Sequence, residues 1–148
     1  MVIIVTGCPA TGKTIIARKI AEKKKLRYID VNQLIKDNKL YSYYSRKDMS
    51  YVVDVKKLNR FLIKLIKKDK DVVLDSHLSH YLPHKYVDEC IVTKCSLKEL
   101  KKRLKKRKYS NKKIRDNLDC EIFDVCHIEA LENKHKVRII DTSDKKTF

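Results

Sequence analysis

Short runs of apolar, mostly β-branched residues alternate along this chain with segments whose apolar residues recur at helical spacing. Such runs predict buried strands, and the segments between them are long enough to form helices that cross from one strand to the next in parallel. We therefore expect an α/β fold, with a five-stranded parallel sheet and flanking helices in one domain over 1–148. The predicted strands cover residues 2–6, 27–30, 71–75, 89–93 and 137–141.

Three further segments have apolar residues at the spacing of an amphipathic helix. Within 54–68 they recur at i, i+3, i+4, i+7 and i+8, which places them in one stripe facing the sheet. The next helix is expected to begin after Ser96, since Ser96 and Glu99 have the spacing of a capping box. One long helix is predicted over 110–133.

The segment between residues 30 and 53 does not follow this alternation. Its four tyrosines, from Tyr41 to Tyr51, lie among polar residues without a clear period. Connections of this length in compact domains are often functional, although an ordinary surface connection is the alternative. The tyrosines are equally compatible with stacking on a nucleotide base and with packing at the surface.

The chain has only two glycines, Gly7 and Gly12, and both belong to one motif. Residues 7–14 read G-C-P-A-T-G-K-T and match the pattern G-x-x-x-x-G-K-[ST] between a predicted strand and a predicted helix. A loop of this kind surrounds phosphates with backbone N–H groups, in conformations that a Cβ atom would obstruct. Lys13 then reaches the β and γ phosphates and the Thr14 hydroxyl binds Mg²⁺. The motif predicts a P-loop NTPase that uses Mg²⁺ with ATP, and a plain glycine turn is the alternative.

The chain is strongly basic, with 36 Lys and Arg residues against 19 Asp and Glu residues and a formal net charge of +17. Much of this excess lies in 96–115, where eleven basic residues accompany the single acid Glu99. Polyanions such as RNA are natural partners for such a segment. A lysine-rich proteome and a solvated helix face are the alternatives.

The cysteines are odd in number and irregularly spaced, which does not suggest a disulfide framework. We expect all five to be reduced in a cytoplasmic protein, with Cys120 and Cys126 on different faces of one helix as core residues. No segment resembles a signal peptide or a membrane span, so no membrane partner is expected. The five are Cys8, Cys90, Cys95, Cys120 and Cys126.

Two downstream motifs make the prediction more specific. Asp75 and His77 form an Asp-x-His at the end of a predicted strand, and residues 107–123 read R-K-Y-S-N-K-K-I-R-D-N-L-D-C-E-I-F. Together with residues 7–14, these motifs resemble the adenylate kinase isoenzyme 6 family of archaea and eukaryotes. Its members are adenylate kinases and also ATPases of small-ribosomal-subunit maturation. The resemblance covers nearly the whole chain, and no Asn-Lys-x-Asp motif of a GTPase is found.

The resemblance implies roles for particular segments and residues. It makes 30–53 the segment that binds the nucleoside monophosphate (NMP) and 106–116 a short lid over ATP, as in nucleoside monophosphate kinases. Arg107 matches the lid arginine that contacts ATP. Asp75 would hold the water shell of the metal, and His77 could position a water molecule for hydrolysis. A polar residue that merely ends a strand is the alternative for His77.

The expected site residues fall into four groups. The catalytic residues are Lys13, Asp75, His77 and Arg107. The residues that bind ATP are Gly7, Ala10, Gly12, Lys13, Thr14, Ile15, Arg103 and Arg107. The residues that bind the NMP are Asp30, Tyr41 and His80. The Mg²⁺ ligands are Thr14 and, through water, Asp75.

Two positions depart from the family pattern. Lys108 stands where the family has a lid glycine, and Ala10 stands where relatives often have a loop glycine. Closure of the lid must therefore hinge on residues that carry a Cβ atom.

The expected function is reversible transfer of the ATP γ-phosphoryl group to AMP, with broad NMP specificity. The AMP phosphate is largely dianionic at pH 7, so no general base is required. ATPase activity and a part in 16S rRNA processing and small-subunit maturation, with rRNA or a small-subunit protein as partner, follow from the resemblance alone. A shikimate-type small-molecule kinase, and an RNA-associated ATPase with little kinase flux, are the alternatives.

Overall fold

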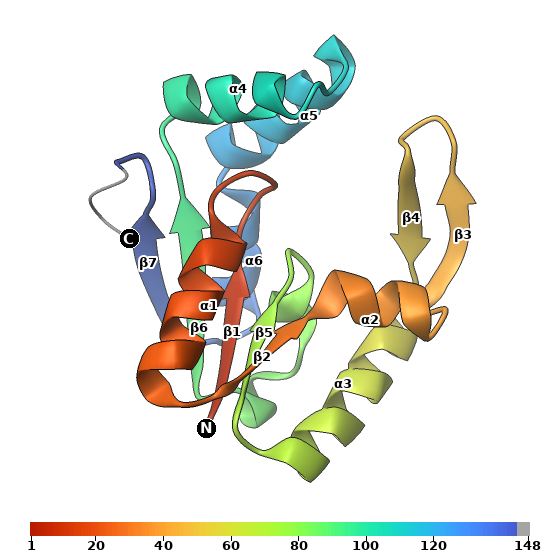
Figure 1. Cartoon of the computed structure of the whole chain (residues 1–148), viewed down its shortest axis with the longest axis vertical. Helices are drawn as coiled ribbons and strands as arrows, with labels where there is room; N and C mark the ends of the chain where they lie inside the picture. Colours follow the sequence, from red (N-terminus) through yellow and green to blue (C-terminus); the bar gives the residue numbers. More distant parts are fainter. Residues whose placement is uncertain (145–148) are drawn as a thin grey trace.

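The computed structural model describes residues 1–144 and is built on a five-stranded parallel sheet (Figure 1). The strands are β1 (Val2–Thr6), β2 (Arg27–Asp30), β5 (Val72–Asp75), β6 (Glu89–Lys94) and β7 (Val137–Asp141). Their order across the sheet is β2-β5-β1-β6-β7. This confirms the predicted fold class, and the predicted strands agree with the observed ones to within one residue at each end.

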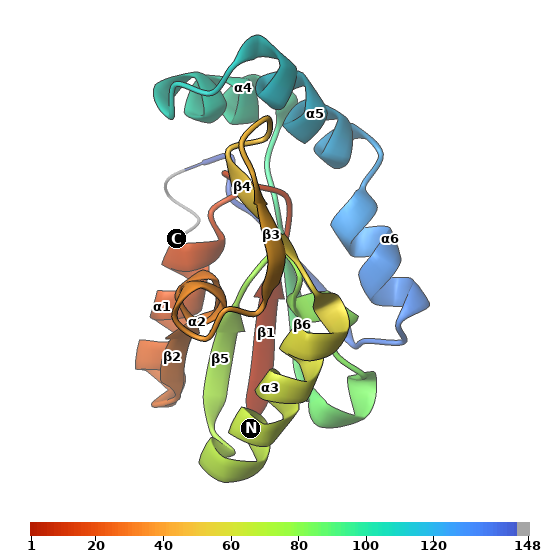
Figure 2. The same ribbon diagram turned by 90° about the vertical axis from the view of Figure 1, so that its right-hand side faces the viewer.

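Helices cover both faces of the sheet. They are α1 (Lys13–Lys24), α2 (Val31–Asp37), α3 (Val55–Asp69), α4 (Leu97–Lys106), α5 (Asn111–Ile122) and α6 (Val125–Glu132), with 3₁₀ helices η1 (Ser79–Tyr81) and η2 (His84–Tyr86). The central strand β1 alternates between two cores: Val2 and Ile4 pack in the larger core with α3, and Ile3 and Val5 pack beneath α1. Figure 2 shows α1 and α6 on opposite sides of the sheet.

Side-chain caps fix where the helices that approach the site begin. The Asp54 carboxylate accepts a hydrogen bond from the Lys57 N–H at 3.1 Å and begins α3. The Ser96 hydroxyl accepts from the Glu99 N–H at 3.3 Å, as the capping-box spacing predicts. Ser110 caps α5 in the same way.

The irregular segment 30–53 forms α2 and an antiparallel hairpin of β3 (Tyr41–Ser45) and β4 (Ser50–Val53), which stands away from the main sheet (Figure 1). The ring centroids of Tyr41 and Tyr51 lie 4.4 Å apart. The hairpin was not predicted, because both strands are short and lack an apolar–polar alternation that repeats for long enough.

The prediction of one helix over 110–133 is wrong, because the helix is broken into α5 and α6 at Asp124. This residue has a left-handed φ of 54°. The Asp124 carboxylate forms an ion pair with the Lys94 ammonium, and its other oxygen lies 2.7 Å from His127 Nδ1. These two contacts hold the break in place. The apolar periodicity continues across the break, so the sequence pattern did not reveal it.

The expectation of five reduced cysteines is also wrong. Cys8 and Cys120 form a disulfide across a sequence separation of 112 residues. Cys90, Cys95 and Cys126 are free and buried. The fold makes this pairing because the loop after β1 meets the last turn of α5, and linear spacing does not show such a contact.

Among the described residues, no helix combines the length and the apolar character needed to cross a bilayer.

Candidate active site

The loop after β1 is pressed so closely against its neighbours that its two glycines are required. Gly7 has a φ of +148°, and a Cβ atom there would lie 2.4 Å from Thr93 Oγ1 and 2.7 Å from the Thr93 carbonyl oxygen. Gly12 has a φ of +90°, and a Cβ atom there would lie 3.2 Å from Thr142. Both positions thus have a backbone conformation that favours glycine. Gly7 also has no room for a Cβ atom, and at Gly12 the contact with the Thr142 side chain would be tight.

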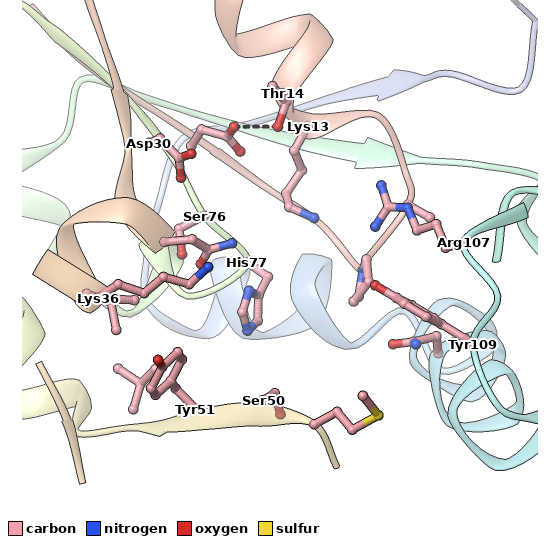
Figure 3. A pocket seen from close by; sticks show the side chains of 18 of the residues that line it. Lys13, Thr14, Asp30, Lys36, Ser50, Tyr51, Ser76, His77, Arg107 and Tyr109 are labelled. Carbon is pink, nitrogen blue, oxygen red and sulfur yellow. Dashed lines mark hydrogen bonds between the residues drawn. The ribbon is translucent and has the colours of Figure 1, made fainter. Parts of the chain in front are cut away.

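Lys13 extends from the first residue of α1 into the cavity in front of the loop (Figure 3). Its ammonium group donates a 3.1 Å hydrogen bond to the Cys8 carbonyl oxygen. Burial lowers the pKa of Lys13 to about 8, and the nearby Asp75 carboxylate opposes part of this effect. An anionic phosphate beside this ammonium would favour its charged form.

Thr14, Tyr28 and Asp75 form a compact oxygen cluster at the start of α1. The Thr14 hydroxyl and the Tyr28 hydroxyl each donate a 2.7 Å hydrogen bond to Oδ2 of Asp75. Burial and this hydrogen bond raise the pKa of Tyr28 to about 12. A hydroxyl and a carboxylate beside a phosphate loop are hard donors that suit Mg²⁺. Thr14 and Asp75 are therefore the residues that could hold the metal that ATP requires.

His77 lies just beyond β5, with its ring facing the same cavity (Figure 3). Its side chain is exposed and lines the cavity. The pKa of His77 is lowered to about 4, mainly by desolvation of the ring. The positive charge of Lys13 and, to a smaller extent, His80 lower it further. The ring is therefore neutral at pH 7, with one nitrogen free to accept a hydrogen bond.

A single cavity of about 990 Å³ connects these groups to the two segments that flank them. The hairpin side contributes Asp30, Lys36 and Tyr51, and the side of α4 and α5 contributes Arg107, Tyr109 and Lys113. Figure 3 shows Tyr51 across the cavity from Lys13, with Arg107 and Tyr109 on a third side. Nine expected site residues line the cavity: Ala10, Gly12, Lys13, Thr14, Ile15, Asp30, Asp75, His77 and Arg107.

The sequence matches the AAA domain family over residues 3–124. A Methanocaldococcus jannaschii protein named "Putative adenylate kinase" is 38% identical over 98% of this chain and 78% of its own length. The "Adenylate kinase isoenzyme 6 homolog" of Dictyostelium discoideum is 35% identical over 93% of this chain and 78% of its own length. The chain belongs to the adenylate kinase isoenzyme 6 family.

Solved structures share the fold of this isoenzyme 6 family member. Shikimate kinase from Acinetobacter baumannii superposes with a TM-score of 0.69 at 12% identity, covering 99% of this chain and 86% of its own. The YorR protein of Bacillus subtilis gives a TM-score of 0.62 at 17% identity, covering 96% and 86%. At these identities the likeness concerns the fold alone.

Four residues expected in the site of this family member lie outside the cavity lining: Gly7, Tyr41, His80 and Arg103. Gly7 lies against Thr93, where a Cβ atom would clash, and Tyr41 packs against Tyr51. The Arg103 guanidinium donates to the carbonyl oxygens of Ala10 and Thr142, so it braces the loop.

His80 is buried behind β1 instead of facing the cavity. Its Nδ1 lies 2.7 Å from the Thr6 hydroxyl, and its Nε2 lies 3.4 Å from the Glu129 carboxylate. The structure therefore places His80 where it supports the strand that leads into the loop.

Several side chains of the candidate site were missed from the sequence. The Tyr28 hydroxyl donates a hydrogen bond to the Asp75 carboxylate. Tyr28 could have been identified only from its position on β2, which pairs with β5. That signal depends on strand order, which one sequence does not provide. Lys36 also lines the cavity and carried no motif. Lys113 and Asn117 line it too, and although they lie within the 107–123 motif they were given no role from the sequence.

Proposed function

We propose that this protein is an adenylate kinase that transfers the γ-phosphoryl group of ATP to AMP and releases two ADP. The observation that carries the proposal is that one cavity joins the phosphate loop to both the α2–hairpin side and the lid side. Its volume of about 990 Å³ is at the upper end for a ligand pocket, as two nucleotides require. The names of the relatives support the same reaction.

In the proposed reaction an oxygen of the AMP phosphate attacks the γ-phosphorus. A new P–O bond forms, and the bond from the γ-phosphorus to the bridging β–γ oxygen breaks. The loop and Lys13 hold the phosphates, and Arg107 neutralises charge that develops on the transferred group. Thr14 and, through water, Asp75 would hold Mg²⁺, which would supply further charge neutralisation.

The α2–hairpin segment is proposed to bind the acceptor. Asp30, Lys36 and Tyr51 from this segment line the cavity, Asp30 next to Asp75 at the strand ends and Tyr51 across the cavity from Lys13 (Figure 3). Lys36 offers a cation for the acceptor phosphate, and the Tyr51 ring offers a face for the base. Closure of this segment and of the lid 106–116 would exclude water, which competes with AMP for the γ-phosphoryl group.

An acceptor panel tests the proposal. ADP formation from ATP and Mg²⁺ is measured with AMP, CMP, UMP, shikimate or no acceptor, for the wild type and for Lys13→Ala. We expect AMP to give the fastest reaction, with two ADP per ATP consumed, and Lys13→Ala to be inactive. ADP formation that depends on shikimate would instead support the small-molecule kinase alternative.

We also propose that the protein hydrolyses ATP when no acceptor is bound. Support comes from His77, whose neutral ring faces the cavity and can accept a hydrogen bond from water. Release of inorganic phosphate in the absence of AMP measures this activity.

We also propose a cytoplasmic role in 16S rRNA processing and small-subunit maturation. The proposal is supported by the exposed basic face of α4 and the residues after it. Lys101, Lys102, Lys105, Lys106 and Lys108 are exposed, and within residues 1–144 none of them forms an ion pair. Phosphate contacts through this face would give RNA binding with a log–log salt slope near −0.7 per phosphate on single strands. Titration of an rRNA fragment at several salt concentrations tests this, and a flat response would contradict it.

A further inference from the structure

Three cysteines from distant parts of the chain meet directly behind the phosphate loop. Cys8 belongs to the loop, Cys120 to the last turn of α5, and Cys126 to the first turn of α6. Their sulfur atoms all lie within 4.8 Å of one another, and Cys8 and Cys120 are joined as a disulfide. The proposed phosphoryl transfer gives this cluster no role.

On the loop side, the disulfide is anchored at a residue that organises the P-loop. The Cys8 carbonyl oxygen accepts hydrogen bonds from Lys13 Nζ at 3.1 Å and from the Thr11 hydroxyl at 2.6 Å. Any restraint on Cys8 therefore acts on the backbone next to the phosphate-binding lysine.

On the lid side, the disulfide is anchored on the face of α5 that points to the nucleotide cavity. Lys113 and Asn117 line the cavity, and Cys120 follows at i+7 and i+3 on the same helical face. The connection from Arg107 to Ser110 joins this helix to α4, and Arg107 also lines the cavity. The bond thus ties the loop directly to the helix that would have to move when the lid opens.

We propose that Cys8 and Cys120 form a redox modification site that controls the mobility of the lid. With the disulfide closed, α5 is held against the loop and nucleotide release is slow. With both thiols reduced, α5 moves freely relative to the loop and release is faster. The inference rests on the proposed function, because it concerns regulation of the same nucleotide site. Disulfides in reducing compartments are usually transient and redox-sensing.

The modification requires only a small-molecule disulfide as oxidant. The Cys120 thiolate attacks one sulfur of that molecule, which forms a mixed disulfide and releases one small thiolate. The Cys8 thiolate then attacks Cys120 Sγ, which forms the Cys8–Cys120 bond and releases the second small thiolate. Two electrons pass to the oxidant, and the two cysteine protons are taken up by the released thiolates.

Exposure favours this order of events. Cys8 is only 3% exposed, whereas Cys120 is partly exposed and accessible to a small oxidant. Cys126 remains a protonated thiol at neutral pH, because burial raises its pKa to about 11. Cys8 and Cys120 are the pair that closes, because these two sulfur atoms are the ones that the structure joins.

The test compares the wild type equilibrated with dithiothreitol and with oxidised glutathione. Alkylation and mass measurement should find five free thiols in the reduced form and three in the oxidised form. Stopped-flow release of a fluorescent ATP analogue and the rate of phosphoryl transfer are then measured on both forms. We expect release to be at least about threefold slower in the oxidised form and to recover on reduction.

Two variants make the comparison specific. Cys120→Ser should release nucleotide at the reduced wild-type rate under both conditions. Cys95→Ala removes a buried thiol outside the pair and should respond to oxidation as the wild type does. The comparison of oxidised and reduced wild type needs no variant, so it holds even if Cys120→Ser does not fold.

The inference would be overturned if the two wild-type forms release nucleotide at equal rates and reduction lowers only the melting temperature. The disulfide would then serve only to stabilise the fold. An oxidation response that persists in Cys120→Ser would overturn it as well. Redox-dependent release without any phosphoryl transfer would support this inference while contradicting the proposed kinase function.

Discussion

The Thr14 hydroxyl donates a 2.7 Å hydrogen bond to Oδ2 of Asp75, and this contact joins the start of α1 to the end of β5. The same oxygen also accepts from Tyr28. The carboxylate is thus held in place beside the phosphate loop before any ligand binds, which is the preorganisation that a metal–phosphate site needs.

Asp75→Asn should abolish most phosphoryl transfer, because it removes the negative charge beside Thr14 while keeping the side-chain shape. We expect kcat to fall by about 100-fold or more and the Mg²⁺ concentration for half-maximal rate to rise. Tyr28→Phe is the matched control, since it removes one hydrogen bond from the same oxygen and should cost about fivefold. Equal losses in the two variants, measured by ADP formation against Mg²⁺, would contradict a charge role for Asp75.

ATP binding at pH 8 should take up protons through Lys13. The lowered pKa of about 8 leaves roughly half of this lysine neutral in the free protein. Phosphates beside the ammonium raise its pKa, so binding should take up about half a proton, and affinity should fall as the pH rises above 8. Calorimetric titrations in two buffers of different ionisation enthalpy measure the uptake.

Lys13→Arg provides the control for this linkage, because its guanidinium stays charged throughout the range. Its uptake reports only protons bound by ATP and by other groups. The same uptake in the wild type and in Lys13→Arg would show that Lys13 is already fully charged in the free protein.

His77→Ala should reduce ATP hydrolysis more than AMP phosphorylation. Hydrolysis requires an oriented water, whereas the AMP phosphate brings its own nucleophilic oxygen. We expect about a tenfold or greater loss of hydrolysis, with a smaller loss of transfer. Parallel assays of phosphate release and ADP formation decide the point, and equal losses would remove a separate role in positioning water.

Lys108→Gly should stabilise the protein and alter the lid. Lys108 follows α4 with a left-handed φ of 58°, where glycine avoids the clash of a Cβ atom. Relief of this strain, offset by the entropy of glycine in the unfolded chain, should raise the free energy of unfolding by up to about 1 kcal/mol. We also expect faster nucleotide release, because the hinge becomes more flexible.

Lys25→Gly is the matched control for the lid effect. Lys25 ends α1 with a φ of 57°, so the same strain is relieved far from the lid. Denaturant unfolding should show a similar gain in stability for both variants, but only Lys108→Gly should change nucleotide release. If both variants leave release unchanged, the lid does not hinge at Lys108.

The sheet and the phosphate loop were predictable because their signals are local. Strands such as Val72–Asp75 are continuous buried runs, and the loop combines both glycines with Lys13 and Thr14. The helix break at Asp124 was not predictable, because it depends on the distant side chain of Lys94. The disulfide escaped prediction for the same reason, since its partners meet only after the chain has folded.

In the candidate site, too, residues within short motifs were predictable, whereas residues placed by the path of the folded backbone were not. Asp75, His77 and Arg107 could be selected from the sequence because each belongs to a recognisable short pattern, and all three line the cavity. His80 was expected at the acceptor, but the turn after β5 buries it against Thr6. Which histidine of a short segment faces a cavity depends on the backbone path, and residue type does not determine it.

Transfer of the γ-phosphoryl group from ATP to AMP can be followed by tracing a label on that group. ATP labelled at the γ-phosphate is incubated with AMP, Mg²⁺ and the protein, and the products are separated. We expect the label at the β-phosphate of ADP formed from AMP, and we expect Lys13→Ala to form no labelled ADP. Label found only in inorganic phosphate, whether or not AMP is present, would show that the protein is not an adenylate kinase.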